Sequence, residues 1–406
     1  MQRHLHVNKS FWLKKSVIYI IYFLGINALN IQSAIIGRMN VWKIFRYGFF
    51  HLKNHQDLYL FYPNEYFDSY LYSPTFPVLF APFSLLPNYV AYFLWNNLNM
   101  LLVPFLIYKV KGISDEKKAI VCYIALIEIL TCLQGTQTNV MIGCLMLLSF
   151  LSFEKKHYWV AAFAIAAGFY LKIYPLITAS LFLFYAHKGK FIFKLIISLL
   201  ILGLLPLFFI TPTELYLQYQ NWFRELTLDS TDNGDRISLT GLLHVYFNIS
   251  GYGKLIVQFA GVGILFLPFL RRGLFKEYFY RYYFLCALLI WVVLFNHASE
   301  IYGYAIAILG VGLWYVHQKQ NRAMTVFIIL FIFFASVLSI DPTPQFISRY
   351  IYHHSLKTIP YTIILGIILF QMLSKKPSFF TRPEEKDSVS KHALQGKEYF
   401  QQIMPK

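Results

Sequence analysis

The sequence predicts an all-α, polytopic membrane protein, and its composition carries this prediction. Hydrophobic residues make up 57% of the 406 residues, and charged residues make up only 14%. Soluble domains carry roughly a quarter charged residues, and a soluble chain of this length could not bury so much apolar surface. The four cysteines are too few for a disulfide scaffold and have no metal-ligand spacing, so we expect them in the apolar core.

About twelve apolar segments are expected to cross the membrane. A helix needs about 20 apolar residues to cross a bilayer, and several of these segments are nearer 15. Neighbouring segments with short links are therefore expected to be tilted, broken or partly inserted. The expected spans lie near residues 16–37, 88–108, 119–133, 140–153, 158–171, 173–186, 191–210, 255–270, 279–295, 301–317, 323–340 and 359–374.

The net charge of +17 follows this topology. With the N-terminus inside, the segments on the inner side hold 26 of the 36 Lys and Arg residues, and those on the outer side hold 9. An excess of Lys and Arg on cytoplasmic loops sets the orientation of membrane proteins. We therefore interpret the charge as a topology signal and not as a nucleic-acid surface. The pattern predicts a multi-pass membrane protein with both termini cytoplasmic, and we expect it in a bacterial plasma membrane.

We expect one integral-membrane domain over residues 1–374 and a polar cytoplasmic tail over 375–406. Two substantial loops, 38–74 and 211–253, are expected on the outer face. Segment 76–86 is too short to span and contains prolines, so it is either re-entrant or a loop packed on the membrane surface. Ten of the 19 acidic residues fall on the outer side, and any chemistry is therefore expected there.

Lys172 is the only cation in about thirty mostly apolar residues, and Pro175 is expected to break the helix beyond it. An ionisable residue at membrane depth is by default a candidate functional residue. An ammonium there would suit a lipid-linked phosphate. The alternative is a lysine whose head reaches the outer headgroups from a helix end.

Short polar links on the outer face supply further candidates. Gln134, Gln137 and Asn139 lie in one link and suit the binding of sugar hydroxyls, or they form a polar turn. His297 and Glu300 lie in another link and are either an acid–base pair or a satisfied turn.

Two further acidic features require interpretation. Glu128 lies inside an expected span and needs a buried polar partner or a function. The acidic cluster at 229–235 has only a distant likeness to a metal-binding Asp-x-Asp motif. We expect no metal and no cofactor.

The order of motifs along residues 16–340 resembles the family-87 glycosyltransferases, membrane enzymes of the GT-C class. The motifs are DLY (57–59), YSPTFPVLFAPFSLLP (72–87), LWNNLN (94–99), QGTQTN (134–139), GFYLKIYP (168–175) and ISLTGLL (237–243).

The resemblance implies a GT-C-like helical bundle with its site formed by extracytoplasmic loops. It implies transfer of a mannose-like hexose, with inversion, from a polyprenyl-phosphate carrier to an envelope glycan or glycolipid. Gln137 and Asn139 match the family's amide-containing stretch, and Lys172 matches a lysine near the donor phosphate. A carboxylate in the first outer loop is implied as the general base.

One position departs from the family pattern. Asn40 stands where such enzymes carry an early aspartate, and an amide cannot accept a proton as a carboxylate does. Asp57, Asp68 and Glu300 are the candidates for the base. A transporter or flippase for a lipid-linked glycan and an inactive scaffold of the same fold remain as alternatives.

Overall fold

The protein is helical throughout the part that the structure describes. The computed structural model describes residues 11–231, 236–339 and 343–380, and every regular element within them is a helix, which confirms the predicted all-α class. The α-helices are α2 (Lys15–Ile36), α3 (Asn40–Lys53), α4 (Thr75–Ser84), α5 (Asn88–Ile107), α6 (Asp115–Gln134), α7 (Asn139–Glu154), α8 (Tyr158–Leu171), α9 (Lys188–Leu204), α10 (Pro212–Thr231), α11 (Leu239–Phe247), α12 (Tyr252–Phe266), α13 (Tyr278–Leu294), α14 (Tyr304–His317), α15 (Arg322–Ala335), α16 (Gln345–His353) and α17 (Thr358–Ser374).

Short 3-10 helices extend or interrupt this series. They are η1 (Tyr174–Phe184), η2 (Leu205–Phe208), η3 (Leu267–Leu270), η4 (Arg272–Leu274), η5 (Ile301–Gly303), η6 (Val337–Ser339) and η7 (Pro377–Phe379). The expected tail lies outside the described residues from position 381 onward.

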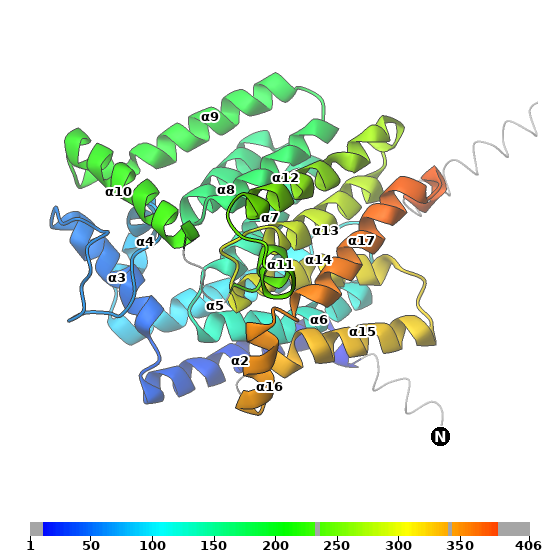
Figure 1. Cartoon of the computed structure of the whole chain (residues 1–406), viewed down its shortest axis with the longest axis horizontal. Coiled ribbons are helices and arrows are strands. Elements are labelled where there is room, and N and C mark those ends of the chain that lie inside the picture. The colour runs from blue at the N-terminus through cyan, green and yellow to red at the C-terminus, as the bar shows by residue number, and fades with distance from the viewer. Residues whose placement is uncertain (1–10, 232–235, 340–342, 381–406) are drawn as a thin grey trace, which may run out of the picture.

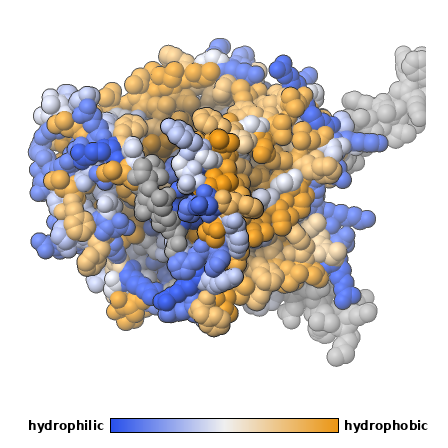
Figure 2. Space-filling model, viewed as in Figure 1, coloured by the Kyte–Doolittle hydropathy of each residue, from blue (hydrophilic) through white to orange (hydrophobic). Residues whose placement is uncertain are grey.

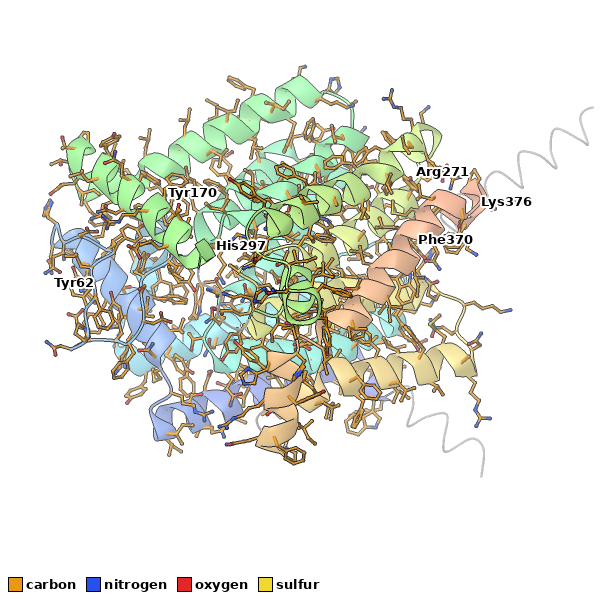
Figure 3. The ribbon with its side chains drawn as sticks, in the orientation of Figure 1. Tyr62, Tyr170, Arg271, His297, Phe370 and Lys376 are labelled. Atoms are coloured by element: carbon orange, nitrogen blue, oxygen red, sulfur yellow. The ribbon has the colours of Figure 1, made fainter. Side chains whose placement is uncertain are left out.

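The long helices run side by side, so their connections gather at two ends of a bundle (Figure 1). The basic end comprises the connections 109–114, 155–157, 271–277 and 318–321, together with 375–380. There Arg281 forms an ion pair with Glu154, and the Arg271 guanidinium donates to the Lys375 carbonyl at 2.8 Å. The loop end comprises 37–74, 135–138, 209–231, 236–251, 295–303, 336–339 and 343–357. Figure 3 shows Arg271 and Lys376 at the basic end and Tyr62 at the loop end.

Within residues 11–231, 236–339 and 343–380, five helices are long and apolar enough to cross a membrane, and the pair α16 and α17, bent by 52°, adds a sixth. The expected count of about twelve spans is therefore not confirmed. Several expected spans correspond to shorter helices, such as α7 with 16 residues and α8 with 14. At about 1.5 Å per residue, a helix of this length covers only about two thirds of a hydrocarbon core about 30 Å thick.

Two of the helices too short to span, α13 and α14, lie inside, whereas most of the candidate spans lie outside. Every described residue of α14 except His317 is buried, whereas the candidate span over α12 and η3 is only 17% buried. A helix facing lipid must cover the full bilayer thickness, while a helix enclosed by protein need not. Figure 2 shows hydrophobic residues over the surface between the two ends, including α9 and α17, and hydrophilic residues at both ends.

The two outer segments expected as loops contain helices that position the site. Segment 38–74 holds α3, and segment 211–253 holds α10 and α11. Segment 76–86 forms the helix α4, which packs against α3 and contains Pro82 within it. Its Pro77 falls in the first turn, where the missing N–H has no intrahelical partner to lose. The four cysteines are free and buried, as expected.

Candidate functional site

A cavity of about 480 Å³ opens within the loop end, where Figure 3 shows His297. It is bounded by residues from the first outer loop, α7, the break after α8, α10, α12 and the link before η5. Six of the eight site residues predicted from the sequence line it. They are Asp68, Gln137, Asn139, Lys172, His297 and Glu300.

Lys172 reaches the cavity because the chain stops being helical at this point. Helix α8 ends at Leu171, Lys172 is extended with φ −153° and ψ 143°, and η1 starts two residues later with Pro175 in its first turn. The Lys172 ammonium donates to Asn139 Oδ1 at 3.3 Å, and the Tyr174 hydroxyl donates to the same oxygen at 2.8 Å. An amide oxygen carries no formal charge, so this contact orients the ammonium without neutralising it.

Asp68 is exposed at the cavity wall and has a strained backbone. Its φ of 91° lies in the left-handed region, which a non-glycine residue seldom adopts. The carboxylate accepts the backbone N–H of Ser69 at 2.8 Å. The preceding residue, Phe67, is hydrogen-bonded through both backbone groups to the Asn40 side chain at the start of α3. Strained residues that the surrounding structure holds in place concentrate at functional sites.

His297 is oriented by an amide from a neighbouring helix. The Gln258 side-chain nitrogen, on α12, lies 2.9 Å from His297 Nδ1. With the amide nitrogen donating, Nδ1 is the acceptor, so the neutral ring carries its hydrogen on Nε2. In this tautomer Nε2 is the donor of the ring.

Glu300 lies beside a cation that also lines the cavity. Its carboxylate is 3.5 Å from the Arg236 guanidinium, in the segment that leads into α11. Two cations, Lys172 and Arg236, and two carboxylates, Asp68 and Glu300, therefore line the same pocket.

The other two predicted site residues, Asp57 and Gln134, do not line the cavity. Asp57 Oδ2 accepts the Asn221 amide at 2.7 Å, and its Oδ1 accepts the backbone N–H of Tyr59 at 3.0 Å. Asp57 therefore joins the first outer loop to α10. Gln134 is the last residue of α6.

Several residues that line the cavity were not predicted as site residues. Gln258 is an isolated amide in an apolar helix, and this pattern indicates a candidate site residue in the same way as Lys172. Arg236 gave no such signal, because it lies in a polar outer segment. From the sequence alone, Tyr72 and Trp291 look like ordinary residues of the hydrophobic core. Burial raises the pKa of Tyr72 well above its usual value, so its hydroxyl keeps its proton.

Among the described residues, no group of three or more His, Cys, Asp or Glu side chains could hold a metal ion. Asp232 and Asp235, from the acidic cluster noted above, lie outside the described residues.

The glycosyltransferase family 87 model matches residues 70–339, about two thirds of the chain. The chain therefore belongs to this family of membrane glycosyltransferases. The matched region contains Lys172, Asn139, His297 and Glu300, while Asp68 lies two residues before it. The comparison with curated proteins finds no match.

Proposed function

We propose that this family-87 glycosyltransferase moves a mannose-like hexose from a polyprenyl-phosphate carrier to an envelope glycan or glycolipid. The observation that carries the proposal is one cavity lined both by the Lys172 ammonium, which contacts the neutral Asn139 amide oxygen, and by the Asp68 carboxylate. Transfer from a lipid phosphate needs a cation for the phosphate, a base for the acceptor hydroxyl and hydrogen-bonding groups for the sugar. The cavity contains all three.

The roles follow from the chemistry of each group. Lys172 binds the donor phosphate as a point charge. Asp68 accepts the proton of the acceptor hydroxyl as its oxygen attacks the anomeric carbon, and the bond from this carbon to the phosphate oxygen breaks. The lipid phosphate leaves with the electron pair, and attack from the opposite side inverts the configuration. Gln137, Asn139 and His297 contact sugar hydroxyls.

The orientation is part of the proposal. The positive-inside rule supports a basic end whose Lys- and Arg-rich turns face the cytoplasm, and we infer from it that the cavity opens on the extracytoplasmic side of a bacterial plasma membrane. Both termini are then cytoplasmic.

Two alternatives make different use of the same residues. A transporter would hold its polar residues near the bilayer midplane between two repeats, whereas these gather at one end of the bundle. An inactive scaffold would lack a base, whereas Asp68 supplies a carboxylate at the cavity despite the amide at Asn40.

The test is a transfer assay on purified protein in lipid, with radiolabelled polyprenyl-phosphate hexoses and extracted envelope glycolipids as a mixed acceptor pool. We expect label to move from one donor to a glycolipid. Donor binding without transfer from any hexose would contradict the proposal and favour the scaffold or the transporter.

A further inference from the structure

The Arg236–Glu300 ion pair joins one firmly held partner to one that faces open space. The Arg236 side chain is 16% exposed and the Glu300 side chain is 43% exposed. Both residues line the cavity that contains Lys172. Moving the carboxylate away from the guanidinium would therefore disturb less of the surrounding packing than moving the guanidinium.

The backbone around Arg236 is held by contacts to three other segments. The Ser355 hydroxyl donates to the Arg236 carbonyl at 2.9 Å, and the backbone N–H of Ile237 donates to the Ser299 carbonyl at 2.9 Å. In α11, a Cβ at Gly241 would lie 2.0 Å from the Arg236 carbonyl oxygen, so the two backbones touch. These contacts fix where the arginine enters the cavity.

A second arginine–glutamate pair in the same chain has a different geometry. At the basic end, Arg281 makes two hydrogen bonds to Glu154, at 2.6 and 2.9 Å, with both side chains nearly buried. That pair has the short, two-pronged geometry of a structural ion pair. The Arg236–Glu300 pair lacks this geometry, because its charged atoms are 3.5 Å apart and it lies beside the open cavity.

We propose that the Arg236–Glu300 pair is an anion-exchange gate, in which the phosphate of the lipid donor replaces the Glu300 carboxylate on Arg236. The inference rests on the proposed function, because it assumes that the cavity binds a polyprenyl phosphate. Arg236 and Lys172 then hold the phosphate from two sides. The released Glu300 carboxylate becomes an acceptor for a hydroxyl of the donor sugar.

The charges and shapes of the groups favour this exchange. A guanidinium matches phosphate oxygens with two parallel N–H bonds, so phosphate competes directly with the carboxylate. A neutral sugar has no charge with which to displace Glu300. Release of Glu300 from Arg236 would therefore depend on the phosphate. The Glu300 carboxylate would become available to the sugar only when a donor is bound.

The test measures binding of a polyprenyl phosphate without sugar to the protein in lipid nanodiscs. We expect Arg236→Ala to weaken binding at least about tenfold, since it removes a charge-assisted hydrogen bond. We expect Glu300→Gln to strengthen binding several-fold, because the competing carboxylate is gone. In an Arg236→Ala background, Glu300→Gln should have no such effect.

Arg224 and Glu225 provide a matched control. They form a pair at 3.8 Å on α10, outside the cavity, and Arg224→Ala and Glu225→Gln should leave phosphate binding unchanged. Glu300→Asp keeps the charge and serves as a second variant if Glu300→Gln does not fold, with binding expected between wild type and Glu300→Gln.

Three outcomes would overturn the gate. Weaker binding in Glu300→Gln would mean that Glu300 merely holds Arg236 in place, and unchanged binding in Arg236→Ala would mean that the phosphate lies elsewhere; both leave the proposed function standing. A wild-type protein that binds no polyprenyl phosphate would contradict the gate and the proposed donor together.

Discussion

Asn40 and Phe67 exchange two hydrogen bonds. The Asn40 amide nitrogen donates to the Phe67 carbonyl, and the Asn40 side-chain oxygen accepts the Phe67 N–H at 2.8 Å. An ionised aspartate has no donor and could make only the second bond. The residue that departs from the family pattern therefore fastens the loop that carries Asp68 at the cavity wall. We infer that Asn40 is a positioning residue and that Asp68 supplies the base.

The first prediction concerns this base. Asp68→Asn should reduce the transfer rate at least about 100-fold, the usual contribution of a positioned general base. The measurement is the initial rate at saturating donor. Asp57→Asn is the matched control, since Asp57 lies outside the cavity, and it should keep most of the activity in folded protein. A near wild-type rate in Asp68→Asn would place the base elsewhere.

The second prediction concerns the charge at Lys172. Lys172→Ala should raise the KM for the donor at least about tenfold, because the phosphate loses a charged partner. Asn139→Asp should act in the same direction, since a carboxylate 3.3 Å from the ammonium would neutralise it. Lys53→Ala, on the exposed surface of α3, is the control. An unchanged KM in Asn139→Asp would count against a phosphate at Lys172.

The third prediction concerns Glu128, which the sequence marked as needing a partner. Its carboxylate lies 2.8 Å from the Lys357 ammonium, and both side chains are at most 2% exposed. Glu128→Gln should lower the free energy of unfolding by about 3–5 kcal/mol, because it leaves a buried charge unpaired. Thermal or denaturant unfolding in detergent measures this loss.

Two further variants separate pairing from packing at this position. Adding Lys357→Met to Glu128→Gln should recover most of the stability, since no buried charge then remains. Asp115→Asn breaks an exposed pair with Lys118 and should change stability by about 1 kcal/mol or less. A double variant as unstable as Glu128→Gln alone would contradict the ion-pair explanation.

The fourth prediction concerns pH at His51, in α3. Burial lowers the pKa of His51 from its ordinary value of 6.5, although the Glu65 carboxylate, 2.7 Å from Nε2, acts in the opposite direction. Below pH 6.5 the unfolded chain binds a proton that the folded chain does not, so stability falls as the pH falls through this window. Hydrogen exchange over residues 40–66, corrected for the intrinsic pH dependence, should accelerate as the pH falls.

The variant His51→Gln should abolish this acceleration, whereas replacing the exposed His55 should not. Greater protection at lower pH would contradict it.

The predictable part of the site consists of one isolated cation and the polar links between apolar segments. Lys172 stood out because burying a cation without a role is unfavourable, and Asn139 stood out because it lies in a polar link on the outer face. Asp57 looked equally suitable in the first outer loop, but its partner Asn221 is 164 residues away. A single sequence does not reveal such a contact, so a structural carboxylate and a catalytic one look alike.

The number of spans was less predictable for a related reason. The apolar runs of α7 and α8 resemble those of lipid-facing helices, although both helices are short and largely enclosed by protein. Apolar composition reports burial in either lipid or protein, and only the packing distinguishes them. The helices of the outer segments, α3 and α10, were read as loops because their polar faces lowered the hydropathy.

The Glu128–Lys357 pair also has a consequence for synthesis. The two residues are 229 positions apart, so at about 5–20 residues per second the ribosome needs roughly 10 to 45 seconds to make the partner. During this interval α6 carries a carboxylate with no lysine to meet it. A nascent chain arrested before Lys357 keeps Glu128 without this partner, which distinguishes it from the completed protein.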